Sequence, residues 1–148
     1  SETSFAALRC KELRVGDLLV CRLADPPGRA CILPDIGSYK AITSVDVTIF
    51  RPPERVADRA FLVNVFSTPH WFRIVSDHSG GTTRKRIARG ALGRLWIRVP
   101  PIAEQQAIGR VLSDMDADIT AVEGRQRKAR QLKQGMMQQL LTGRIRLV

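Results

Sequence analysis

The sequence of 148 residues has no apolar run of about 18 residues, the length that a helix needs to span a membrane. It also lacks a stretch with a charged start and an apolar middle, the pattern of a secretory signal. These absences argue against a membrane-spanning or secreted protein. The sequence therefore predicts a cytoplasmic protein.

Cysteine and histidine are both scarce, and neither is clustered. Cys10, Cys21 and Cys31 lie ten or eleven residues apart, without a C-x-x-C pair or a Cys/His spacing typical of zinc sites. In apolar contexts such as "LLVCRL" they are predicted to be small buried thiols of a reducing compartment. His70 and His78 are too isolated for a metal site or a general base, so we expect both on the surface.

The sequence also lacks the features of a catalytic site. Its nearest acidic cluster, Asp114, Asp116 and Asp118, has i, i+2, i+4 spacing on a predicted helix, so its carboxylates cannot converge on one metal ion. No glycine-rich cofactor loop is recognisable. We therefore predict no catalytic residue, no metal site and no cofactor held by this chain.

Acidic residues are absent between Asp77 and Glu104, and the whole chain has a formal net charge of +10. The acid-free stretch carries six basic residues: Arg84, Lys85, Arg86, Arg89, Arg94 and Arg98. Such a surface attracts polyanions, either nucleic acid or anionic lipid. Charge alone leaves both partners open.

The chain is long enough for one modest core, and the Pro100–Pro101 pair divides it. Residues 1–100 predict an α+β domain with short strands in 17–23, 29–34, 44–50 and 95–99. One helix is expected at about 57–67. A second is expected after a Ser67 or Thr68 cap with Pro69 in its first turn, burying Trp71, Phe72 and Val75. Trp96 is also expected in the core.

Residues 101–148 predict one long helix that ends at Gly143. An apolar seam with 4,3 spacing runs along it, and eight of its ten positions are apolar: Ile108, Leu112, Met115, Ile119, Val122, Gln126, Ala129, Lys133, Met136 and Leu140. A seam of about 50 Å needs a partner helix to cover it. Acids occupy the first half of the helix and bases the second, which favours an antiparallel pair over an accidental order of solvated charges.

Two segments of this region resemble a known family. "LWIRVPPIAEQQAIGRVLSDMDADI" at 95–119 and "KARQLKQGMMQQLLTGRIRL" at 128–147 are similar to the distal conserved region of the specificity subunits of type I restriction-modification enzymes. Upstream, "VGDLLVCRL", "GRACILPD" and "FLVNVFSTPHWFRIVSDHSGGTTRKRI" resemble, more loosely, the second half of a target recognition domain of that family.

The resemblance implies a non-catalytic subunit that recognises a split site in double-stranded DNA. Residues 1–100 would be a target recognition domain, incomplete at its start, and 101–148 a helical spacer that pairs as an antiparallel coiled coil. The partners implied are modification subunits, which bind S-adenosylmethionine and methylate adenine, and motor-nuclease subunits, which use Mg²⁺ and ATP. The chain would be a fragment of such a subunit, or a half-subunit that pairs with another copy.

The basic stretch supplies the predicted DNA contacts, because phosphates are bound by Arg, Lys, hydroxyls and backbone N–H groups. The basic residues there are expected at the start of a short helix. The candidates are Ser79, Gly80, Gly81, Thr82, Thr83, Arg84, Lys85 and Arg86. Arg22 and Arg29, which flank the turn at 23–28, are further candidates. Arg89, Arg94 and Arg98 could equally form a solvated face.

Two further expectations concern partners. The helix surface outside the seam, including Glu104, Gln105, Gln106 and the "KQGMMQQLL" end, is expected to dock the modification subunit. The competing function is a coiled-coil scaffold whose basic loop binds anionic lipid or nucleic acid without specificity. The narrow seam argues against a helix lying on a membrane, which would carry a broad apolar face.

Overall fold

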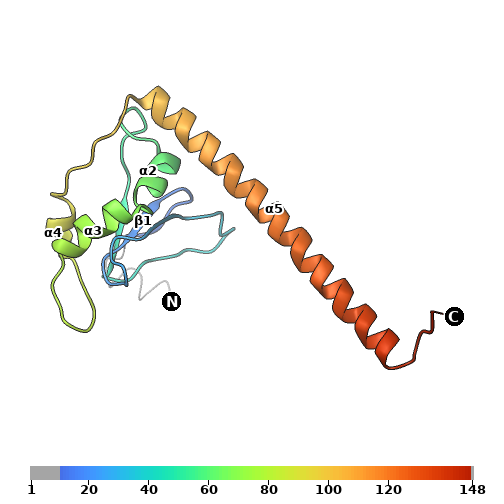
Figure 1. Ribbon diagram of the computed structural model, residues 1–148. Helices are drawn as coiled ribbons and strands as arrows, with labels where there is room; N and C mark the ends of the chain where they lie inside the picture. The colour runs from blue at the N-terminus through green and yellow to red at the C-terminus, as the bar shows by residue number, and fades with distance from the viewer. Residues whose placement is uncertain (1–10, 148) are drawn as a thin grey trace. The chain divides into compact units, whose positions relative to one another are not determined.

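The structure, a computed structural model, describes residues 11–147 and falls into two compact units that divide between Arg110 and Val111 (Figure 1). Its elements are β1 (Leu18–Cys21), β2 (Ala30–Ile32), β3 (Val47–Phe50), α2 (Arg59–Val65), α3 (Pro69–Asp77), α4 (Arg89–Leu92) and α5 (Ile102–Leu141). The predicted α+β fold with a long C-terminal helix is confirmed. Among residues 11–147, no helix is long and apolar enough to cross a membrane.

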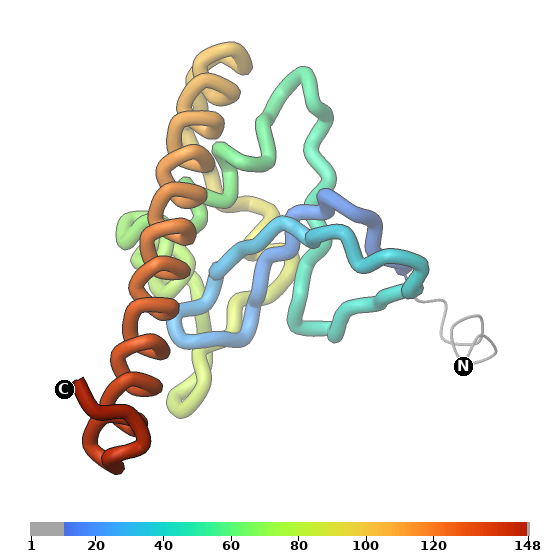
Figure 2. Tube along the Cα trace, turned by 90° about the vertical axis from the view of Figure 1, so that its right-hand side faces the viewer, coloured from blue at the N-terminus to red at the C-terminus, as the bar shows by residue number. Residues whose placement is uncertain are grey.

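The three strands form an antiparallel sheet in the order β2-β1-β3, and Figure 2 follows the chain through its loops. Leu18 of β1 pairs with Ile32 on one side and with Phe50 on the other. Alternate residues of β1, Leu18 and Val20, are buried because side chains on a strand point to opposite faces. All three strands lie within the ranges predicted from the sequence.

Helices α2 and α3 both have side-chain caps, of which the sequence predicted the one at α3. The Asp58 side chain accepts a hydrogen bond from the Phe61 backbone N–H (2.8 Å) at the start of α2. Thr68 Oγ1 does the same for the Trp71 N–H (3.2 Å), with Pro69 at the first position of α3. The buried core consists of Leu18, Val20, Ala57, Phe61, Leu62, Phe66, Trp71, Val75 and Ile87.

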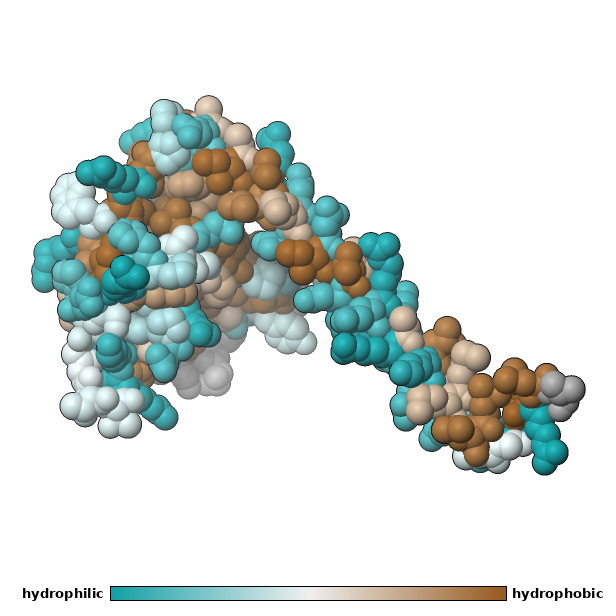
Figure 3. All heavy atoms as spheres, viewed as in Figure 1, coloured by the Kyte–Doolittle hydropathy of each residue, from teal (hydrophilic) through white to brown (hydrophobic). Residues whose placement is uncertain are grey.

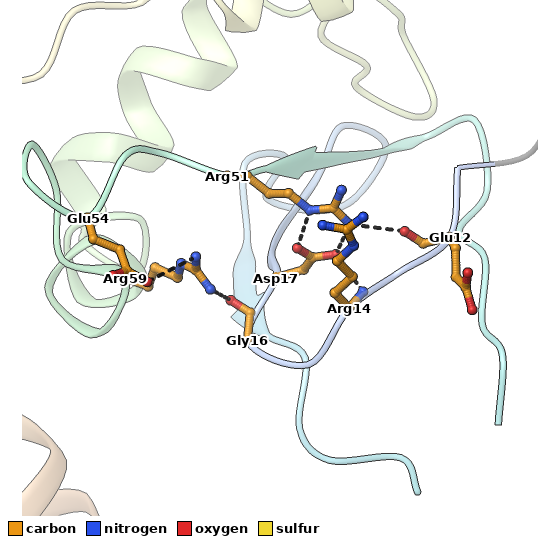
Figure 4. Close-up of polar contacts among 7 residues, drawn as sticks. All are labelled: Glu12, Arg14, Gly16, Asp17, Arg51, Glu54 and Arg59. Carbon is orange, nitrogen blue, oxygen red and sulfur yellow. Dashed lines mark hydrogen bonds and ion pairs between the residues drawn. The ribbon is translucent and has the colours of Figure 1, made fainter. Parts of the chain in front are cut away.

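A buried carboxylate fixes the start of β1 (Figure 4). Arg51, just after β3, binds both oxygens of Asp17, with Nε–Oδ1 at 2.5 Å and Nη2–Oδ2 at 2.6 Å. The Arg14 backbone N–H donates to the same carboxylate (2.8 Å). The hydrogen bond from Arg51 lowers the pKa of Asp17, against the opposing effect of burial.

The turn at 23–29 packs closely on α3. Gly28 has a φ of +92°, and its carbonyl accepts a 2.8 Å hydrogen bond from Trp71 Nε1. A Cβ at this position would lie 2.8 Å from Trp71 Nε1 and 2.9 Å from Val75 Cγ2. Only glycine has both the required backbone freedom and the required size here.

Three predictions about the first hundred residues are wrong. Residues 95–99 form no strand, because they pair with neither β2 nor β3, although their side chains partly alternate in exposure. Trp96 is 92% exposed rather than in the core. Cys31 is exposed because it pairs with Leu19, on the sheet face opposite the buried Leu18 and Val20, and Cys21 is half-buried. Cys10 lies outside the described residues.

The first turns of α5 are held against α2 by a buried amide. Gln105, 1% exposed, accepts a hydrogen bond from the Asp58 backbone N–H (3.1 Å) and donates to the carbonyls of Pro100 (2.8 Å) and Val56 (3.2 Å). One turn later, a Cβ on Gly109 would lie 2.8 Å from Asp58 Oδ1. These two residues allow the close approach of the two helices.

Beyond Arg110, α5 continues to Leu141, and its 40 residues correspond to about 60 Å. Gly143 ends it as predicted, with a φ of +72°, and the Ile145 N–H donates to the Gln139 carbonyl. Figure 3 shows apolar side chains at intervals along this helix. Four seam residues, Met115, Ile119, Val122 and Met136, are each more than half exposed.

Candidate nucleic-acid interface

The basic loop, defined as residues 80–86, is closed at its base by backbone pairing and lies between α3 and α4 (Figure 1). Gly80 and Arg86 exchange two hydrogen bonds, with N···O distances of 3.0 and 2.8 Å. Arg86 also bridges to Leu23, and the Ile87 N–H donates to the Arg22 carbonyl (3.1 Å). The loop is therefore fixed to the end of β1.

The expectation that the charges lie at a helix N-terminus is wrong. Helix α4 begins only at Arg89, because residues 80–86 close a hairpin-like loop first. The loop requires glycine at position 81, because its φ is +110° and a Cβ there would collide with the Arg84 carbonyl. Gly80 is exposed, and a Cβ there would meet no other atom of the described chain within 4 Å.

The three basic side chains of the loop differ in what they bind. Lys85 Nζ donates to Ser76 Oγ (2.7 Å), and Arg86 Nη2 forms a 2.7 Å ion pair with Asp46. Arg84 is exposed and has no hydrogen bond or ion pair within the described residues. Arg84 is therefore the loop cation that is most available to an external anion.

The predicted hydroxyl donors also divide into two kinds. Thr82 and Thr83 are exposed and make no side-chain hydrogen bond to residues 11–147. Ser79 Oγ instead donates to the Val75 carbonyl at the end of α3 (2.7 Å). The threonines keep their full hydrogen-bonding capacity for a ligand.

The two outlying arginine candidates lie in different environments. Arg22 is only 7% exposed and donates through its guanidinium to the carbonyls of Ile87 (3.3 Å) and Val45. It therefore joins the end of β1 to two other segments from inside the fold. Arg29 is exposed, without a side-chain partner in the part of the chain that the structure describes. Arg89, Arg94 and Arg98 are likewise exposed.

A cleft of about 410 Å³ separates the basic loop from the turn after β1. This loop cleft is lined by Leu23, Ala24, Asp25, Thr82, Thr83, Arg84 and Lys85. Its walls present hydroxyl groups, two cations and one carboxylate. Such a set can contact both the phosphates and the base edges of DNA. Among residues 11–147, no group of three His, Cys, Asp or Glu side chains could hold a metal ion.

Comparison with known families is consistent with this interface. Residues 31–131 match the family model described as the type I restriction modification DNA specificity domain. The match covers more than half of the chain, including the loop cleft's basic wall and most of α5. The chain belongs to the type I restriction-modification DNA specificity family. As a specificity-family chain it recognises DNA and assembles with other subunits of a restriction-modification system, as the sequence resemblance implied.

Sequence reasoning missed several residues that shape this specificity domain. Gly28 fixes the turn opposite the basic loop, and Asp46 holds Arg86 by an ion pair. Asp25 lines the loop cleft although it lies 57 residues or more from the basic wall. The Pro-Pro-Gly sequence at 26–28 signals a tight turn, but nothing local to these positions indicates what lies across from them.

Proposed function

We propose that this chain is the non-catalytic DNA-reading and spacer part of a type I restriction-modification complex. The domain before the Pro100–Pro101 pair reads one half of a split DNA site, and α5, which follows the pair, packs against a second helix to set the distance to the other half. Methylation and cleavage belong to the partner subunits, which bring S-adenosylmethionine, Mg²⁺ and ATP. The domain roles then divide at the Pro100–Pro101 pair.

The chemistry of the basic loop supports the DNA-reading role. Phosphate contacts set the register of a protein on the duplex before any base is read. Arg84, Thr82 and Thr83 are exposed and unpaired within residues 11–147, so they can bind phosphate without losing an internal partner. Lys85 and Arg86 contribute charge while their own contacts hold the loop in place.

The exposed seam of α5 is the observation that carries the spacer role. Met115, Ile119, Val122 and Met136 leave 52–56% of their surface open to water along one helix. A partner helix would cover them by the packing of a coiled coil. The acids at 114, 116, 118 and 123 would meet the bases at 125–133 in an antiparallel pair, whereas a parallel pair would place like charges together.

The docking surface proposed for the modification subunit requires one correction. Gln105 was expected to face this subunit, but it is buried against α2 and fully occupied by hydrogen bonds within the chain. Glu104 and Gln106 are exposed and stay in the proposal. At the other end of α5, Met137 and Leu141 are 41% and 79% exposed and offer apolar contact.

Light scattering of the purified chain at high micromolar concentration tests the helix pairing. We expect twice the mass of one chain. Met136→Asp should weaken the association because the pair would bury a charge. Gln131→Asp adds the same charge at an exposed position outside the seam and should leave it intact. A mass of one chain for the unmodified protein, or equal effects of the two variants, would refute the pairing.

A further inference from the structure

One acidic side chain lies in the loop cleft, opposite the basic wall. Asp25 is exposed and lines this cleft together with Arg84 and Lys85. It forms no ion pair with either cation, and no other hydrogen bond of its side chain falls within the described residues. Lys85 binds Ser76 instead. The carboxylate is therefore an acceptor without an internal donor.

The chemistry of a carboxylate limits what it can contact on DNA. It accepts hydrogen bonds and is repelled by phosphate, so the phosphate backbone gains nothing from it. In the major groove, guanine and thymine present only hydrogen-bond acceptors, whereas cytosine N4 and adenine N6 are donors. A carboxylate at this position therefore favours a base with an exposed amino group and disfavours the other two.

The turn that carries Asp25 is held firmly enough to position it. The Cys21 N–H donates to the Arg29 carbonyl and the Gly28 N–H to the Cys21 carbonyl, both at 2.8 Å, which closes the neck of the turn. Trp71 Nε1 holds the Gly28 carbonyl from the core side. The Leu23–Arg86 bridge ties this turn to the basic loop, so both walls of the loop cleft keep their separation.

We propose that Asp25 is a specificity-determining residue that accepts a hydrogen bond from a base amino group, cytosine N4 or adenine N6, in the major groove. The proposal rests on the proposed DNA-reading function and adds a role to it. The basic wall grips the backbone, and Asp25 reads one base across the loop cleft.

Selection from a randomised duplex library, with the full chain assembled with its modification subunit, tests this role. The unmodified chain should enrich a defined motif; at the position that Asp25 controls, an A·T pair would identify adenine N6 as the group read and a G·C pair cytosine N4. Asp25→Ala, which removes the acceptor, should reduce the preference at that position by about 5- to 150-fold, the discrimination typical of one base contact. Asp25→Asn keeps an acceptor oxygen and should retain a preference there. The rest of the motif should stay unchanged.

Asp35→Asn is the matched control. It removes the same charge at another exposed turn, where the Asp35 side chain accepts a 2.8 Å bond from the Gly37 N–H that an Asn oxygen can also accept. This variant should select the unmodified motif. If Asp25→Ala also selects it, or only raises binding to all sequences, Asp25 does not read a base. If the unmodified chain selects no motif at all, the proposed DNA-reading function fails with it.

Discussion

The packing of the turn at 23–29 on α3 makes a sharp prediction about Gly28. Replacing it by Ala imposes two costs. A residue with a Cβ pays about 1–2 kcal/mol for a left-handed backbone such as the +92° φ seen here. The new methyl group would also lie 2.8–2.9 Å from Trp71 and Val75, well inside the usual carbon contact distance of about 3.5–4 Å.

The size of the effect follows from these two terms. Overpacking a well-filled core costs about 1–3 kcal/mol. Alanine also lowers the conformational entropy of the unfolded chain, which offsets about 0.4–1 kcal/mol of the loss. The net loss for Gly28→Ala should therefore be about 1–5 kcal/mol, a large share of the roughly 5–15 kcal/mol that keeps a typical domain folded. Trp71 and Val75 are almost fully buried, so neither can move aside into solvent.

Gly37→Ala provides the matched control. Gly37 also has a left-handed φ, +65°, but a Cβ there meets nothing within 4 Å. It should cost only the backbone term, about 1 kcal/mol after the gain from the unfolded chain. The difference between the two variants isolates the packing of the turn on α3.

Urea unfolding followed by tryptophan fluorescence measures both variants. Trp96 is 92% exposed, so a Trp96→Phe background leaves Trp71, 4% exposed, to report on the core. The free energy of unfolding should fall more for Gly28→Ala than for Gly37→Ala by about 1–3 kcal/mol. Equal losses would show that the turn is not packed as described.

Three further predictions concern the DNA grip, the start of α5 and acid stability. Replacing residues 84–86 with Ala should weaken binding to matched and mismatched DNA alike. If each side chain touches a phosphate, the slope of log K against log salt, titrated with the assembled complex, should change by about 2.7. An unchanged slope would show that the loop is a solvated surface. Gln105→Ala should lower the free energy of unfolding, measured in urea, by about 1–3 kcal/mol, because it leaves the Asp58 N–H and two carbonyls unpaired. Gln106→Ala, at the exposed neighbouring position, should change it little. Because Arg51 lowers the pKa of Asp17 in the folded state, that carboxylate stabilises the protein above its unfolded pKa of about 3.9 and loses this effect as the pH falls through the folded value. Asp17→Asn should therefore be less stable at pH 7 and show a smaller drop in thermal midpoint below pH 4 than the unmodified chain; parallel pH profiles would contradict this.

Much of the architecture follows from local sequence. The three strands appear where β-branched and apolar residues lie between turn sequences, and Thr68 and Pro69 start α3 as the pattern predicts. The 4,3 spacing and Gly143 predict α5 and its end. These features depend on hydrogen bonds and side-chain periodicity within a few residues of each position, so the sequence alone contains the information.

Other features were decided by contacts between residues far apart in the chain. Residues 95–99 have the composition of a strand, but a strand needs a neighbour with free backbone groups, and they pair with no strand of the sheet. Trp96 is apolar enough for a core, yet the segment that carries it leaves it in water. Gln105 looks like a surface residue and is buried, because the groups that it satisfies lie just before α2, at Val56 and Asp58, and at Pro100.

The candidate DNA site divides in the same way. The charge of residues 84–86 and the flexibility of the two glycines before them are properties of the sequence itself, and they pointed to a phosphate-binding loop. The tertiary structure decided three further points: Arg84 is the loop cation that remains available, Arg22 lies inside the fold, and Asp25 lines the cleft opposite Arg84. The physical reason is that composition fixes the charge of a side chain, whereas its burial and its partners depend on which distant segments the fold brings beside it.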